Sequence, residues 1–257
     1  MKLFNIFLTT FLFFNLLFAQ ESQNMTLVKS ENDLMRSMAQ TYPDFFTLDE
    51  SSVVIRKISE YELRKILILP NDSLDDLNEN IDTQNSFPKL SNAAITIEEI
   101  INIGKTIWAI VEKGKPVLNI NNSWASAMPN GIAHWTQLDN WKAPRSENYS
   151  FSAKNAYGVD AIEVFYRVIY TYGGSLGEKG NFLTNVKVVP LKVSVLWGYS
   201  LDINIEVPAV FNTGSMEDPI GSLQLFITSN ISTVLKTSIV GQTFFISGKG
   251  EFEDFEY

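Results

Sequence analysis

Three tryptophans and an asparagine form the part of the sequence in which binding chemistry is most concentrated. Trp124, Trp135 and Trp141 fall within 18 positions, and Asn130 lies between the first two. An exposed indole ring can stack on the C–H groups of a sugar, and a nearby amide can bond its hydroxyls. We therefore predict that these four residues belong to a ligand-binding surface. The alternative is that the rings close the end of the fold as an apolar plug, because tryptophan is mostly buried in proteins.

The residues that most often carry catalysis or bind metals are scarce. The chain has no cysteine, which excludes a disulfide framework, a thiolate zinc site, an iron–sulfur cluster and a cysteine nucleophile. Its single histidine, His134, excludes a multi-histidine metal site. A serine triad would need His134 beside a serine on a constrained turn, and no serine stands in a G-x-S-x-G context. The sequence thus predicts no catalytic residue, no metal and no cofactor.

Carboxylates are abundant, and hydrolysis of a glycosidic bond needs only two of them. Glu163 and Glu206 each lie inside a predicted strand, but nothing in the sequence pairs them. The simpler interpretation places each on the solvent-facing side of a sheet.

A glycine-rich segment at residues 173–180 is the remaining candidate for a binding loop. Its spacing does not fit a phosphate-binding motif. We predict a flexible hairpin loop between Tyr172 and Phe182, where a rigid sheet would present it to a ligand.

The net charge of the chain bears on the kind of partner that it can bind. The chain holds 29 acidic and 20 basic residues, which gives a net charge of −9. A nucleic-acid binder needs a surplus of lysine and arginine for its phosphate contacts, so nucleic acid is excluded as a general partner. The partner class stays open between a glycan, another protein and a membrane surface.

The first 19 residues have the composition of a secretory signal peptide. Lys2 supplies a positive charge, residues 3–18 are almost wholly apolar, and Ala19 is small enough to precede a cleavage site. The apolar run is about 16 residues long, and a helix that spans a bilayer needs roughly 20. We predict export to a periplasm, the cell surface or the medium, and the absence of cysteine favours a bacterial source. An uncleaved N-terminal anchor is the alternative.

A small structured segment and a linker are predicted after the signal peptide. Residues 20–70 have the pattern of an α/β segment, with a strand over 51–58. Ser59 and Glu62 are spaced as a capping box for a short helix. Residues 71–95 are rich in acidic groups and poor in apolar ones, so they predict an exposed acidic linker.

An amphipathic helix is predicted over residues 96–113. Thr96 and Glu99 are spaced as a capping box, and Gly114 supplies a stop. Isoleucines and Trp108 recur between them at three- and four-residue spacing. We expect this stripe to pack on a sheet, and docking on a membrane or a partner is the alternative.

From residue 115 onward the apolar pattern changes to the two-residue period of strands. Residues 161–172 alternate between two faces, and residues 193–207 repeat the scheme with a bend or bulge at Gly198. Turn signals separate about 6–8 such strands. The fold class is therefore predicted to be mainly β, with residues 96–257 forming the helix and an antiparallel β-sandwich.

Together these features predict an exported, non-enzymatic binding or surface-interaction protein whose ligand the sequence does not identify. A secreted β-sandwich that forms pores in membranes is an alternative, because the chain combines an amphipathic helix with aromatic strands. A glycan hydrolase that uses two carboxylates is a second alternative.

Overall fold

The computed structural model describes residues 32–67, 100–101, 108–113, 116–119, 124–132 and 134–255. These residues form two antiparallel sheets with an apolar core between them, so the predicted mainly-β sandwich is confirmed. The predicted signal peptide and acidic linker lie outside the described residues.

The first sheet has six strands, all paired antiparallel. Their spatial order is β1 (Leu48–Ile58), β6 (Arg145–Asn155), β7 (Asp160–Leu176), β8 (Lys179–Val195), β5 (Ala125–Pro129) and β2 (Ile100–Ile101). Although β1 falls in the predicted N-terminal α/β segment, it pairs along β6 and is a strand of this sheet.

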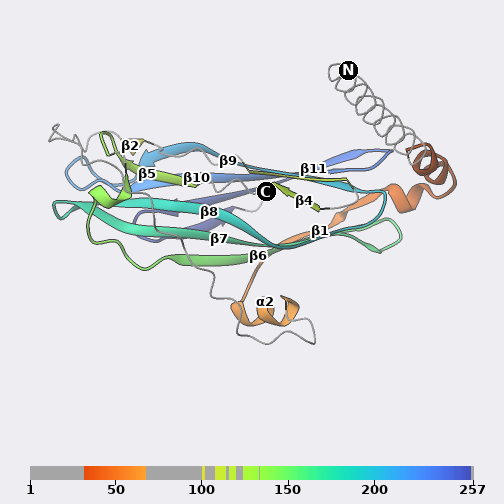
Figure 1. Cartoon of the computed structure of the whole chain (residues 1–257), viewed down its shortest axis with the longest axis horizontal. Coiled ribbons are helices and arrows are strands. Elements are labelled where there is room, and N and C mark those ends of the chain that lie inside the picture. Colours follow the sequence, from red (N-terminus) through yellow and green to blue (C-terminus); the bar gives the residue numbers. More distant parts are fainter. Residues whose placement is uncertain are drawn as a thin grey trace, which may run out of the picture.

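The second sheet also has six antiparallel strands. Their order is β12 (Phe252–Phe255), β11 (Thr237–Ser247), β10 (Gly221–Ser232), β9 (Ser200–Asn212), β3 (Trp108–Lys113) and β4 (Pro116–Asn119). Figure 1 shows the two layers, with β6, β7 and β8 in one and β9, β10 and β11 in the other.

The core follows directly from alternation along the strands. On β7, Ile162, Val164 and Val168 are buried, whereas Glu163 and Arg167 between them stay partly exposed. The alternation that the sequence predicts for residues 161–172 is therefore present, with one face of the strand in the core and the other outside it. Burial of apolar area of this kind, at about 25 cal/mol per Å², holds the sheets together.

Helix α2 (Glu60–Leu67) lies outside the first sheet, beyond β6 in the view of Figure 1, and its side chains contact residues of β6 and β7. Its predicted capping box is confirmed: Ser59 Oγ accepts from the N–H of Glu62 at 3.1 Å, and Glu62 Oε2 accepts from the N–H of Ser59 at 2.9 Å. Leu63 packs with Ile58 and Phe165, which point away from the core on the sheet's outer face. Other helical residues are 32–41 and the 3-10 turns η1 (Pro43–Phe46) and η2 (Trp135–Gln137).

The helix predicted over residues 96–113 is wrong where the structure describes it. Residues 100–101 form β2, and residues 108–113 form β3, which adds to β9 with Ile110 opposite Ile203. Isoleucine and valine are β-branched and prefer extended backbone. The edge of β9 also offers a row of backbone groups with which another strand can pair, and an amphipathic pattern does not reveal such an edge.

The glycine-rich segment is part of a long hairpin instead of a flexible loop. β7 continues through both glycines at 173 and 174, and only residues 177–178 form the turn before β8. The register between the strands shifts several times here, as bulges allow. The predicted loop between Tyr172 and Phe182 is therefore replaced by paired strands.

Residues 193–207 form two strands where the sequence predicts one. β8 ends at Val195 and β9 starts at Ser200, with a turn between them. Gly198 has φ +86° in this turn, a left-handed conformation that glycine adopts without strain. Among the described residues, no helix is long and apolar enough to cross a membrane.

Candidate functional site

The segment between β5 and β6 carries two of the three predicted site tryptophans and is fastened to the tip of the β7–β8 hairpin (Figure 1). Asp139 and Ser175 exchange two backbone hydrogen bonds of 2.9 Å each. The backbone N–H of Lys142 donates to the carbonyl of Tyr172 at 2.9 Å, and Asn140 Nδ2 donates to Ser175 Oγ at 2.8 Å. These hydrogen bonds fix the backbone of the segment on the hairpin. Its side chains are therefore held in place before a ligand binds.

Trp124 and Trp141 belong to a small apolar cluster at this end of the sandwich, and both are partly buried. The buried members of the cluster are Met128, Ile132, Leu138 and Phe182. The plug interpretation therefore describes these two tryptophans better than the binding interpretation does.

Gly174 makes room for the ring of Trp141. A Cβ atom at position 174 would lie 2.5 Å from two ring carbons of Trp141, closer than any van der Waals contact. A glycine on β7 is therefore what allows the indole to lie against the strand backbone.

Trp135 differs from the other two, because this residue is 42% exposed. Its backbone carbonyl accepts a hydrogen bond of 3.0 Å from Nε1 of Trp141. Its ring centroid lies 5.6 Å from that of His134, with the planes inclined by 36°. The backbone of Trp135 is thus bonded to a packed tryptophan, and its indole lies beside an imidazole.

His134 and Gln137 build the turn η2 that carries Trp135. The N–H of His134 donates to Oε1 of Gln137 at 2.9 Å, and Nδ1 of His134 lies 2.8 Å from Oγ1 of Thr136. These contacts satisfy polar groups at the start of the turn, as an N-cap does. The single histidine therefore has a structural task in this turn.

Asn130 lies in the turn that leads out of β5. The N–H of Ile132 donates to the carbonyl of Pro129 at 3.2 Å, and Gly131 has φ +89°, as the third position of a type II turn requires. The side chain of Asn130 is partly buried. Of the four predicted site residues, Trp135 is thus the most exposed.

The two strand carboxylates are not a catalytic pair. Glu163 lies on the first sheet and forms an ion pair of 2.8 Å with Lys192. Glu206 lies on the second sheet, where Asn204 Nδ2 donates to it at 2.6 Å. Each points away from the core on the outer face of its own sheet, as the sequence predicts. In the part of the chain that the structure describes, no three acidic or histidine side chains cluster as metal ligands would.

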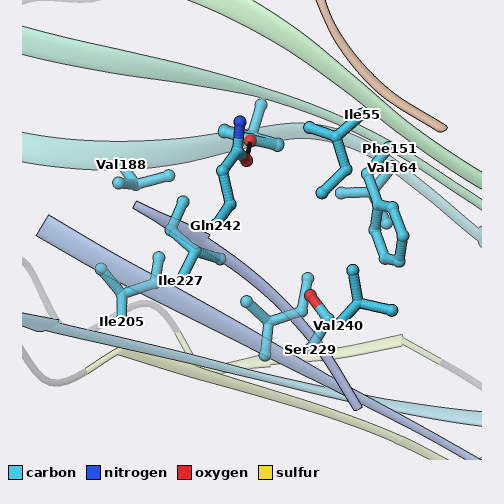
Figure 2. Close-up of a pocket in the computed structure, with 11 residues that line it drawn as sticks. Ile55, Phe151, Val164, Val188, Ile205, Ile227, Ser229, Val240 and Gln242 are labelled. Atoms are coloured by element: carbon cyan, nitrogen blue, oxygen red, sulfur yellow. Dashed lines mark hydrogen bonds between the residues drawn. The ribbon is translucent and has the colours of Figure 1, made fainter. Parts of the chain in front are cut away.

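A small cavity lies inside the core, between the two sheets. Figure 2 shows Ile55, Phe151 and Val164 reaching toward it from the first sheet, and Ile227 and Val240 from the second. It has room for about one water molecule. The cavity is therefore too small to be a ligand site.

A buried polar contact borders this cavity. The hydroxyl of Tyr166 on β7 donates to Oε1 of Gln242 on β11, so a hydrogen bond joins the two sheets inside the apolar core. Burial raises the pKa of Tyr166 well above its ordinary value, and the neighbouring Tyr149 adds to this effect. Tyr166 therefore stays neutral and acts as a donor.

The exposed part of the Trp135 ring is apolar surface against which a ligand ring can pack. The sequence does not identify Gly174, which makes room for Trp141, or Ser175, which bonds the segment that carries Trp135 and Trp141. The cluster of glycines at 173–180 is the feature of the sequence that marks this position. No family model, no curated protein and no solved structure matches this chain.

Proposed function

We propose that this chain is an exported, non-enzymatic binding protein that takes a sugar ring on the open face of Trp135. The observation that carries the proposal is the exposed indole on an otherwise fastened segment. A rigid aromatic ring loses little conformational entropy when a ligand stacks on it. The exposed hydroxyl of Thr136 lies on the same turn, and because a hydroxyl can donate once and accept twice, it can bond a sugar hydroxyl in addition to its contact with His134 Nδ1.

Export is supported by the composition of residues 1–19, which have the charged start and apolar run of a signal peptide. The pore-forming alternative relied on an amphipathic helix over 96–113 together with aromatic strands. The described residues of that helix are strands, so the first of these two supports is lost. The hydrolase alternative needs two neighbouring carboxylates, and the sequence pairs none. Glu163 and Glu206, which lie inside strands, are on different sheets.

The test is a glycan array with the purified protein, followed by titration of each bound sugar into the wild type and two variants. Trp135→Ala removes the stacking face, and we expect it to weaken binding about tenfold or more, as loss of a central aromatic contact does. Trp197→Ala is the matched control, because Trp197 is 39% exposed and lies in the turn between β8 and β9. It should bind sugar like the wild type.

Thermal melting of both variants keeps the result interpretable. Trp135 is an exposed residue, so its replacement by alanine should leave the melting temperature nearly unchanged. Equal sugar binding by Trp135→Ala and the wild type would overturn the proposal. Release of a shortened sugar during the titration would instead identify an enzyme.

A further inference from the structure

The outer face of the second sheet carries four phenylalanines, two of them well exposed. Phe226 on β10 and Phe255 on β12 are 37% and 42% exposed. Phe211 and Phe245 are partly buried and stack on one another, with ring centroids 6.3 Å apart and planes inclined by 15°. Along β10, Phe226 stands between Leu225 and residue 227, which point into the core, so the phenylalanine points outward.

The register places a carboxylate beside each of two rings. Phe226 pairs with Glu206 on β9, and Phe245 pairs with Glu253 on β12. Residues that pair directly across antiparallel strands have Cβ atoms about 4.5–5.5 Å apart. We call this surface the Phe/Glu face, and it consists of Glu206, Phe211, Phe226, Phe245, Glu253 and Phe255.

The part of the chain that contains these four strands and their connections is acidic. Residues 200–255 contain seven Asp or Glu, two Lys and no Arg. Lys236 is paired with Glu50 at 2.7 Å, and Lys249 lies in the turn between β11 and β12. Both Glu206 and Glu253 are exposed, and within the described ranges neither forms an ion pair.

We propose that the Phe/Glu face binds an arginine-bearing segment of a partner polypeptide. A guanidinium stacks on an aromatic face and also forms a planar, two-pronged hydrogen bond to a carboxylate, so an arginine can use both halves of each Phe–Glu pair. This site is separate from the sugar surface at Trp135, because it is built from β9, β10, β11 and β12.

Charge decides between a cationic partner and a second copy of the chain. A symmetric dimer places the same patch of both copies in contact. Glu206 and Glu253 of one copy would then face the carboxylates of the other, and like charges oppose each other across an interface. A cationic segment has the complementary charge.

The experiment measures fluorescence anisotropy of a labelled octapeptide in which arginine alternates with serine, titrated with the purified protein. A peptide with citrulline at each arginine position has the same shape without the charge. The site variants are Glu206→Gln with Glu253→Gln, and Phe226→Ser with Phe255→Ser. The matched control is Asp33→Asn with Glu178→Gln, which loses the same two charges at exposed positions away from the face.

We expect the arginine peptide to bind and the citrulline peptide not to bind. The glutamate pair should weaken binding about tenfold, the phenylalanine pair about fivefold, and the charge-matched control less than about twofold. Equal weakening by the control would show non-specific attraction to an acidic protein and would overturn the proposal. The absence of binding at about 100 μM protein would also overturn it. So would sedimentation that shows a dimer of the wild type and a monomer of the variant with Phe226→Ser and Phe255→Ser.

Discussion

The indole N–H of Trp141 donates to the backbone carbonyl of Trp135 at 3.0 Å, so a packed tryptophan fixes the position of an exposed one. The ring of Trp141 packs against the cluster that contains Met128 and Phe182, whereas Trp135 is 42% exposed. Two residues of one type therefore have different tasks, one in stability and one in presentation.

Replacement of each tryptophan by alanine should separate these tasks. Trp141→Ala removes a packed ring and a hydrogen-bond donor, and we expect it to lower the free energy of unfolding by about 3 kcal/mol. Trp135→Ala should change it by less than about 1 kcal/mol, because the ring is exposed. Urea unfolding followed by circular dichroism measures both values. Equal losses would show that Trp135 also packs.

The sequence predicts correctly those features of the fold that depend only on residues within one strand or one helix. The alternation over residues 161–172 assigns the buried and outer faces of β7 correctly. The spacing of Ser59 and Glu62 predicts the start of α2, because a capping box needs only residues three positions apart.

Features that depend on distant partners could not be predicted in this way. Residues 108–113 look helical by period, yet they pair with β9, which lies about ninety positions later in the chain. The segment around Gly174 looks like a loop, yet its backbone is paired with Asp139 and neighbouring residues. For the site, the sequence identified three tryptophans but not which of them is open, since burial is set by the cluster around Phe182.

Gly174 should not tolerate a side chain, because the ring of Trp141 occupies that space. A Cβ there would meet ring carbons at 2.5 Å, so Gly174→Ala should cost about 1–3 kcal/mol of unfolding free energy through overpacking. Gly241→Ala is the control, because a Cβ at 241 meets nothing within 4 Å. Combining Gly174→Ala with Trp141→Ala should cost less than the sum of the two single changes. Strict additivity would contradict the contact.

Helix α2 is fastened to the first sheet by a carboxylate as well as by Leu63. Glu60 Oε2 accepts from Nη2 of Arg167 at 2.7 Å and from Nδ2 of Asn148 at 3.0 Å. Partial burial by itself would raise the pKa of Glu60, but these contacts, together with Arg64, outweigh it and the pKa is lowered. A lowered pKa in the folded state means that the charged carboxylate stabilises the fold.

The contribution of Glu60 should therefore be lost in acid. It is fully present above the unfolded carboxyl pKa of about 4.3 and disappears as the pH falls through the lower folded value. Glu60→Gln should destabilise the protein at pH 7 by less than about 1 kcal/mol, since the group is half-exposed, and should have almost no effect at pH 3. Urea midpoints of the variant and the wild type at both pH values measure this, with Glu178→Gln as an exposed control. A loss of the same size at pH 3 would contradict the assignment of Glu60 as a charged anchor.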